Sequence, residues 1–170
     1  RDEAGLRRFG VALSKVAAAS RSRVEKRIPI HAELPPEHIR WYAPHVLKER
    51  AGLLVEIGRV KAPDDRAALE MVFSAIVTKF SNKSADTGHA MVERRHRKGL
   101  VTEFFERKGE ELIERWRALA AAVPGRPKKP SFLLSDARRL PHTLGGEFHA
   151  SLVITSPPYG GTYDYAQHHE

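Results

Sequence analysis

Two consecutive prolines near the end of the sequence mark the place where we expect chemistry. The run Ser151-Leu152-Val153-Ile154-Thr155 is largely apolar and β-branched, and it leads directly into Ser156-Pro157-Pro158-Tyr159. A proline can neither donate to a sheet ladder nor continue a helix, so the pattern predicts a buried strand that ends in a stiff loop. That loop carries the hydroxyl of Ser156 and the aromatic ring of Tyr159, which are the candidate site residues.

A second short apolar run, Phe132-Leu133-Leu134, precedes Asp136. We expect this run to be a strand parallel to the first one. In open α/β sheets ligands bind outside the carboxyl ends of the strands, so Asp136 is a candidate for a hydrogen bond to a cofactor. A lone aspartate could equally cap a short turn, and this alternative remains open.

The densest positive cluster is Arg94-Arg95-His96-Arg97-Lys98, directly before a predicted helix. Positive charge at a helix N-terminus is opposed by the helix macrodipole, which favours a role such as phosphate contact. The alternative is a solvated helix start. The two interpretations have equal weight from the sequence.

Amphipathic helices must position these groups. Apolar residues at three- and four-residue spacing predict four helices. The first covers residues 1–26, the second begins at Pro44 and has about four turns, the third runs from Pro63 to about Phe80, and the fourth runs from Leu100 to Val123. The proline-rich segment 124–130 then marks a change from helical to strand pattern. We therefore expect a helical segment over 1–123, a linker over 124–130 and a catalytic segment over 131–170.

Composition limits the classes of function. The 170 residues are 41% hydrophobic and 29% charged, with a formal net charge of +8 and a pI of about 10.0. A polyanion is a plausible partner for such a chain, and a charge that serves only solubility has equal weight. The absence of cysteine excludes disulfides, thiolate zinc sites and cysteine nucleophiles, and the nine histidines lack the spacing of a zinc site, so we expect no metal. No membrane-spanning run or signal peptide is recognisable, which makes a cytoplasmic location the default.

The motif Thr155-Ser156-Pro157-Pro158-Tyr159 resembles the catalytic tetrapeptide of amino-methylating DNA methyltransferases, in which Asp, Asn or Ser precedes Pro-Pro and an aromatic residue. With the preceding run that ends in Asp136 and the upstream run Phe73-Ser74-Ala75-Ile76-Val77, the chain is similar to bacterial site-specific DNA modification methylases. The resemblance is strong after Phe132 and loose before it. It implies an α/β fold: about four helices, followed by two parallel strands of a Rossmann-like methyltransferase sheet that is only partly present.

The resemblance also implies an activity, the transfer of a methyl group from S-adenosylmethionine to an exocyclic amino group in double-stranded DNA. Ser156 and the carbonyl of Pro157 would accept hydrogen bonds from that amino group, Pro158 would help to keep the loop rigid, and Tyr159 would stack on the flipped base. Serine in the first position is similar to the members that methylate cytosine N4, while adenine N6 stays open. The remaining assignments are Asp136 and Thr155 to the cofactor, and Arg94, Arg95, Arg97 and Lys98 to DNA phosphates.

The chain departs from the family pattern in one respect. The glycine-rich loop that holds the cofactor is missing, because neither Gly145-Gly146 nor Gly160-Gly161 precedes a helix pattern. We expect the chain to be an internal part of a longer protein, with that loop before Arg1 or downstream, and to be inactive alone. The alternatives are an RNA or protein amino-group methyltransferase, and a non-catalytic basic helical module that binds nucleic acid.

Overall fold

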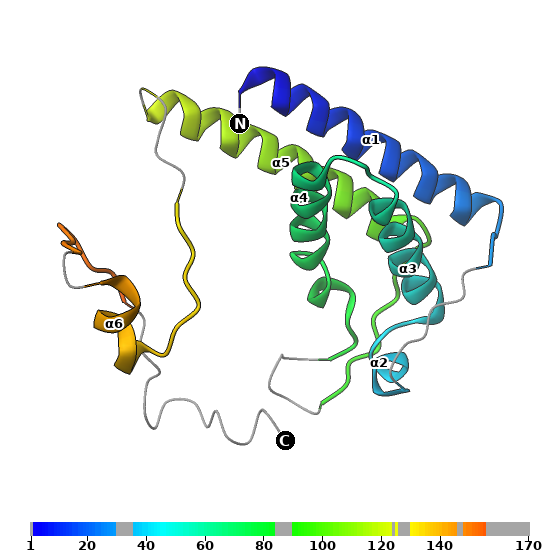
Figure 1. Cartoon of the computed structure of the whole chain (residues 1–170). Helices are drawn as coiled ribbons and strands as arrows, with labels where there is room; N and C mark the ends of the chain where they lie inside the picture. Colours follow the sequence, from blue (N-terminus) through cyan, green and yellow to red (C-terminus); the bar gives the residue numbers. More distant parts are fainter. Residues whose placement is uncertain are drawn as a thin grey trace. The chain divides into compact units, whose positions relative to one another are not determined.

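The computed structural model describes residues 2–29, 36–83, 90–123, 125, 130–145 and 148–155. The chain divides into two compact units, unit 1 (residues 1–124) and unit 2 (residues 125–170). The helices are labelled in Figure 1. Those of unit 1 are α1 (Glu3–Glu25), α2 (Pro36–Trp41), α3 (Pro44–Gly58), α4 (Pro63–Ser74), the 3-10 helix η1 (Thr78–Phe80) and α5 (Leu100–Ala122).

The two longest helices of unit 1, α1 and α5, lie side by side and antiparallel (Figure 1). Near the start of α1 the ring of Phe9 meets Trp116 edge-to-face, with 5.2 Å between centroids. Near its end, the hydroxyls of Ser20 and Thr102 are 2.8 Å apart. Between these points Gly109 of α5 leaves room for a leucine of α1, Leu13. The seam between the two helices is therefore apolar around Phe9 and Leu13 and ends in a buried polar contact at Ser20 and Thr102.

Helices α3 and α4 pack against this pair and complete the core of unit 1. The guanidinium of Arg23 on α1 also binds the carboxylate of Glu56 on α3, with 2.7 Å between Nε and Oε1. Both side chains are mostly buried, so the ion pair ties the two helices together where solvent screens it little. The largest fully buried apolar side chains are Phe9, Leu13, Val46, Leu53, Ile57, Leu69, Ile76, Val101 and Phe105.

Local signals explain where the helices begin. Asp2 caps α1, because its carboxylate accepts the amide of Gly5 at 2.8 Å. A proline occupies the first turn of both α3 and α4, where no helical partner exists for its missing N–H. The helices predicted at 1–26, from Pro44 and from Leu100 are thereby confirmed, to within two residues at each end.

The helix predicted from Pro63 to about Phe80 is shorter than expected. It ends at Ser74, and a turn leads into η1. The carbonyl of Val77 accepts the hydroxyl of Tyr42 at 3.1 Å, and Phe80 still reaches the core. A tertiary contact therefore replaces the last helical turns that the apolar spacing predicted.

The expected sheet is the main error of the sequence-based prediction. The residues that the structure describes contain no strand, only one isolated antiparallel bridge between Lys83 and Met91. The two predicted strands, 132–134 and 152–155, are extended segments whose apolar side chains are exposed, with Phe132 at 90% and Ile154 at 87%. A parallel strand needs a paired neighbour and covering helices on both faces, and no described segment of unit 2 supplies them. The α/β assignment with a Rossmann-like sheet is therefore wrong for these residues.

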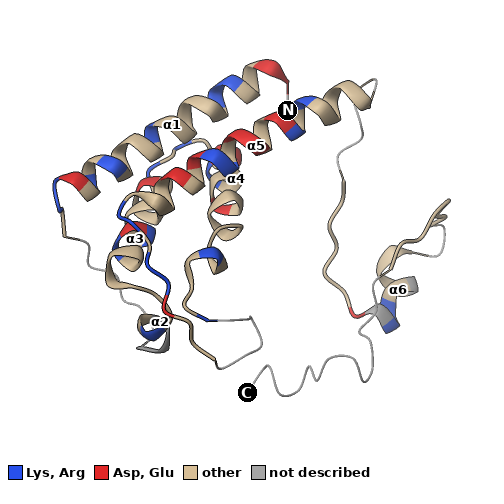
Figure 2. Ribbon diagram, turned by 180° about the vertical axis from the view of Figure 1, so that it is seen from behind, with Lys and Arg blue, Asp and Glu red and all other residues tan. Residues whose placement is uncertain are grey.

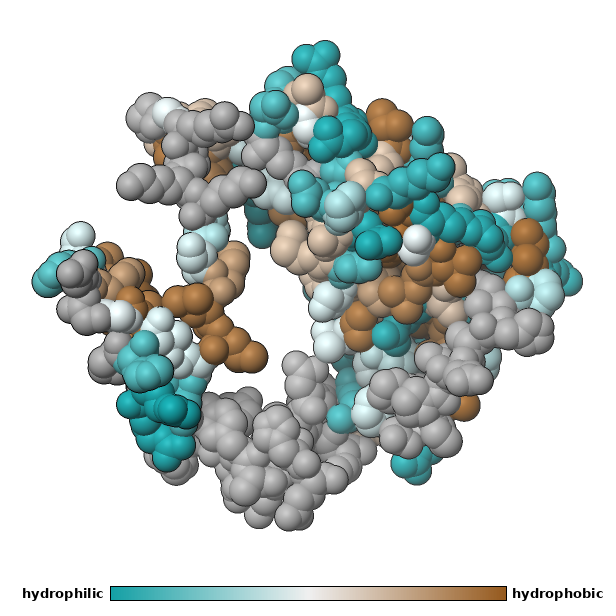
Figure 3. Space-filling model, viewed as in Figure 1, coloured by the Kyte–Doolittle hydropathy of each residue, from teal (hydrophilic) through white to brown (hydrophobic). Residues whose placement is uncertain are grey.

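The described part of unit 2 holds only short helices. These are the 3-10 helix η2 (Ala137–Arg139) and α6 (Leu140–Leu144). Brown apolar side chains of this unit are open to view in Figure 3. Unit 2 thus lacks a buried core within these ranges.

Candidate catalytic segment and basic surface

The predicted catalytic residues Ser156, Pro157, Pro158 and Tyr159 lie outside the described residues. Thr155, assigned to the cofactor, is the last described residue and is exposed. The roles of these five residues stay predictions.

Asp136 forms a turn rather than the end of a strand. Its Oδ1 accepts the backbone amide of Arg138 at 2.9 Å, and its Oδ2 accepts the Arg138 guanidinium at 2.6 Å. Hydrogen bonds from the side chain and then the backbone of Arg138 lower the pKa of Asp136. The structure therefore contains the alternative in which Asp136 caps a short turn, and the carboxylate is bonded to Arg138.

The described residues do not form an S-adenosylmethionine site of the expected kind. Both oxygens of Asp136 are bonded to Arg138, and the residues described after Gly145, 148–155, contain no helix whose N-terminus could face a ligand.

The basic cluster lies on an extended segment, 90–97, and not on a helix. Figure 2 shows it as a blue stretch that leads into α5. The backbone amide of Arg94 lies 3.4 Å from Oδ1 of Asn82, and the amide of Val92 donates to the Asn82 carbonyl at 2.7 Å. Asn82 therefore anchors a segment that has no other regular structure.

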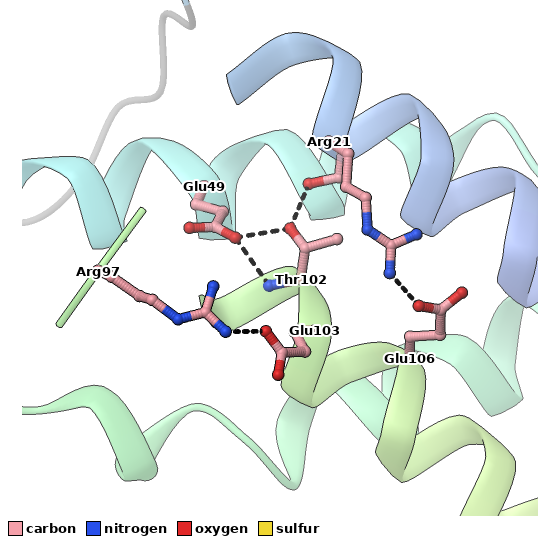
Figure 4. Close-up of polar contacts among 7 residues, drawn as sticks. Arg21, Glu49, Arg97, Thr102, Glu103 and Glu106 are labelled. Carbon is pink, nitrogen blue, oxygen red and sulfur yellow. Dashed lines mark hydrogen bonds and ion pairs between the residues drawn. The ribbon is translucent and has the colours of Figure 1, made fainter. Parts of the chain in front are cut away.

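The four cations assigned to phosphates have different surroundings. Arg95 and Glu93 form a loose 3.8 Å ion pair that is almost fully exposed, and such pairs contribute little to stability. Arg97 is bonded to Glu103 in the first turn of α5 (Figure 4). The exposed side chains of Arg94 and Lys98 have no acidic partner among the described residues. Arg94, Lys98 and the loosely paired Arg95 are thus more available to a phosphate than Arg97.

A buried acid, Glu49 of α3, holds the start of α5. Its Oε1 accepts the amide of Thr102 at 2.8 Å and the hydroxyl of Thr102 at 2.7 Å (Figure 4). Its Oε2 accepts the amide of Gly99 at 3.1 Å. Only 3% of Glu49 is exposed. A helix N-terminus presents free N–H groups and a positive dipole end, so a carboxylate is well suited to this position. Glu49 therefore caps a helix whose N-cap residue, Gly99, lies 50 residues later in the chain.

Sequence reasoning missed this role. A signal was present, since Glu49 follows Val46 by three residues and precedes Leu53 by four, which places a charged residue on the buried face of α3. A charge on such a face needs a partner. The identity of that partner depends on the fold and not on the neighbouring sequence.

His96 lies beneath the basic segment. Its ring meets Phe80 edge-to-face at 5.3 Å, and its carbonyl oxygen is 2.8 Å from Nε2 of His45. Burial, followed by the charges of Arg94 and His45, lowers the pKa of His96. The ring thus favours its neutral form in the folded chain.

Other classes of site are not supported within the described ranges. No three His, Asp or Glu side chains there are grouped to hold a metal ion. None of the helices there combines the length and the apolar composition that a membrane crossing requires. No protein-family model, curated protein or solved structure matches the chain.

Proposed function

We propose that this protein methylates an exocyclic amino group of a base in double-stranded DNA, with cytosine N4 as the target and adenine N6 as the alternative. The observation that carries the proposal is the order Thr155-Ser156-Pro157-Pro158-Tyr159 after an apolar run. S-adenosylmethionine is the donor that this motif implies. The proposal concerns the acceptor side of the reaction, and it does not depend on a sheet.

The chemistry explains the residue types in the motif. The lone pair of an exocyclic amino group is delocalised into the base, so the nitrogen is a weak nucleophile. Oxygen acceptors that bind its hydrogens, here the Ser156 hydroxyl and the Pro157 carbonyl, hold the nitrogen in line for attack and take up developing positive charge. The N–C bond would form as the C–S bond of the sulfonium breaks; the sulfur would leave as the neutral thioether S-adenosylhomocysteine, and the cationic amino nitrogen would release its proton to water. Tyr159 would hold the base by stacking after it leaves the duplex.

The basic surface of unit 1 supports DNA as the partner. Arg94 and Arg95 are exposed on the extended segment, and no buried contact fixes their side chains. Phosphate contacts of this kind supply much of the affinity for DNA without reading its sequence. Unit 1 would then bind the duplex while Ser156–Tyr159 acts on the base.

Labelled methyl transfer tests the proposal directly. The protein as the cell makes it is incubated with methyl-labelled S-adenosylmethionine and with DNA, RNA or protein in turn. Label in DNA that is lost in Ser156→Ala and Tyr159→Ala, with duplex affinity nearly unchanged, is the expected result. Label only in RNA or protein would favour the alternative methyltransferase. DNA binding without transfer would favour a non-catalytic nucleic-acid-binding module.

A further inference from the structure

A cavity of about 580 Å³ lies in unit 1 between the end of α1, the first turns of α3 and the turn before α5. This volume is within the range of cavities that hold small ligands and is far larger than a single ion needs. Three basic side chains from these three places line it: Arg27, Lys48 and Lys98. Cations remote from one another in sequence therefore converge on one space.

These three cations differ from most others of unit 1 in their surroundings. All three are exposed, and no acidic side chain among the described residues forms an ion pair with any of them. Another cation in the wall, Arg23, differs because it is bonded to Glu56 at 2.7 Å. The convergence of unpaired cations gives the cavity a positive field.

The one carboxylate in the wall does not cancel this field. Glu49 lines the cavity, but its two oxygens accept three hydrogen bonds from Gly99 and Thr102 at the start of α5. The positive end of the α5 dipole already offsets its charge. An anion in the cavity would therefore interact with the three cations, while the carboxylate of Glu49 is bonded to the N-terminus of α5.

The backbone of Arg27 provides a second, independent observation. Arg27 has φ of 52°, and it is the only non-glycine residue with positive φ among the described residues. Arg27 lies just after the end of α1. Its backbone amide donates to the carbonyl of Val24 at 3.3 Å, and the amide of Ile28 donates to the carbonyl of Arg23 at 3.1 Å. Glycine is the usual residue at this position of a helix end, because a side chain there is strained. An arginine with a strained backbone in the wall of a cationic cavity points to a role for its side chain.

The rest of the wall is apolar. Val24, Ile28, Pro29 and Pro44 line the same cavity. An inorganic anion would leave this apolar surface uncovered. A ligand with an anionic group and a flat or apolar part would use both kinds of wall.

We propose that this cavity binds a small phosphate monoester about the size of a mononucleotide, with its phosphate on Arg27, Lys48 and Lys98 and its apolar part against Val24 and the two prolines. The site is independent of methyl transfer, because none of its residues belongs to the motif at 155–159. It also reassigns Lys98 from a DNA phosphate to this ligand.

Calorimetric titration of the full chain with AMP as the probe tests this inference, with adenosine and inorganic phosphate as comparisons. AMP should bind, and adenosine should bind at least about tenfold more weakly, because it lacks the charged group. Lys48→Ala and Lys98→Ala should each weaken AMP about tenfold, while Lys48→Arg should retain most of the affinity. Lys15→Ala and Lys61→Ala, exposed lysines that do not line the cavity, are the matched controls and should change nothing.

Arg27→Gly separates binding from folding. It should weaken AMP while raising the melting temperature, because it removes the strained side chain from a position that suits glycine. Absence of AMP binding at millimolar concentration, or equal weakening by the control lysine variants, would overturn the inference. Equal affinity for inorganic phosphate and AMP would overturn the assignment of the apolar wall to the ligand.

Discussion

Replacing Glu49 by glutamine should destabilise unit 1 far more than an ordinary surface substitution. Glutamine keeps one side-chain oxygen that can accept from Thr102. Its side-chain NH2 group would face the backbone amide of Gly99, which in the wild-type chain donates to Oε2 of Glu49 at 3.1 Å. One charge-assisted hydrogen bond is lost, the other two are weakened, and a buried donor is left unpaired. At about 1.5–3 kcal/mol for a hydrogen bond to a charged group, we expect a loss of about 2–3 kcal/mol for Glu49→Gln. For Glu49→Ala, which removes every acceptor, about 3–5 kcal/mol is expected.

Urea unfolding followed by far-ultraviolet circular dichroism measures this loss as a shift of the midpoint. Glu70→Gln is the matched control, since Glu70 is an exposed glutamate on α4 with no ion pair among the described residues, and its effect should stay within about 0.5 kcal/mol. A double-mutant cycle with Thr102→Val should give a coupling of at least about 1 kcal/mol. If Glu49→Gln lies within the range of the control, the carboxylate does not hold the start of α5 and the cap described above is refuted.

Three further outcomes are expected. Gly109→Ala should lower the unfolding free energy by about 1–2 kcal/mol, because the new Cβ would lie 2.4 Å from Leu13 Cδ2 in the α1–α5 seam. The control Gly58→Ala, which has open space around it, should be neutral or stabilising. Equal effects of the two variants in urea unfolding would contradict the close approach of Gly109 and Leu13. Stability should fall as the pH drops below 6.5, the ordinary pKa of histidine, because the unfolded chain then binds a proton that the half-buried His96 of the folded chain resists. His96→Gln should flatten this part of the pH profile of the urea midpoint, and an unchanged profile would exclude His96 as the cause. Replacing Arg94 and Arg95 together by glutamine should reduce the slope of log affinity for duplex DNA against log salt by about 2, and an unchanged slope would remove both from the DNA interface. The matched double variant for this last test, Lys15→Gln with Arg66→Gln, removes two exposed cations elsewhere on unit 1.

The helices of unit 1 were predictable because their signals are local. Apolar spacing located α1, α3 and α5, and prolines located the starts of α3 and α4. Where a tertiary contact decides the outcome, as at the end of α4, local spacing was insufficient.

The strands could not be predicted in the same way. The runs at 132–134 and 152–155 have the composition of buried strands, but a strand exists only when another segment pairs with it. An apolar composition shows that a segment would suit a buried strand, but it does not show that a pairing strand is present. The cap at Glu49 and the convergence of Arg27, Lys48 and Lys98 were hidden for a related reason, since each joins residues far apart in the chain.

The pairing of α1 with α5 has a consequence for folding during protein synthesis. Leu13 and Gly109, which touch in the seam, are separated by about a hundred residues. At a synthesis rate of about 5–20 residues per second, the apolar stripe of α1 leaves the ribosome roughly 5–20 seconds before its partner. During that interval the nascent helix exposes Phe9, Leu13 and Val16, which are buried in the finished fold. The ribosome-bound chain therefore offers a transient target for chaperones, and slowing translation before residue 100 should increase its aggregation.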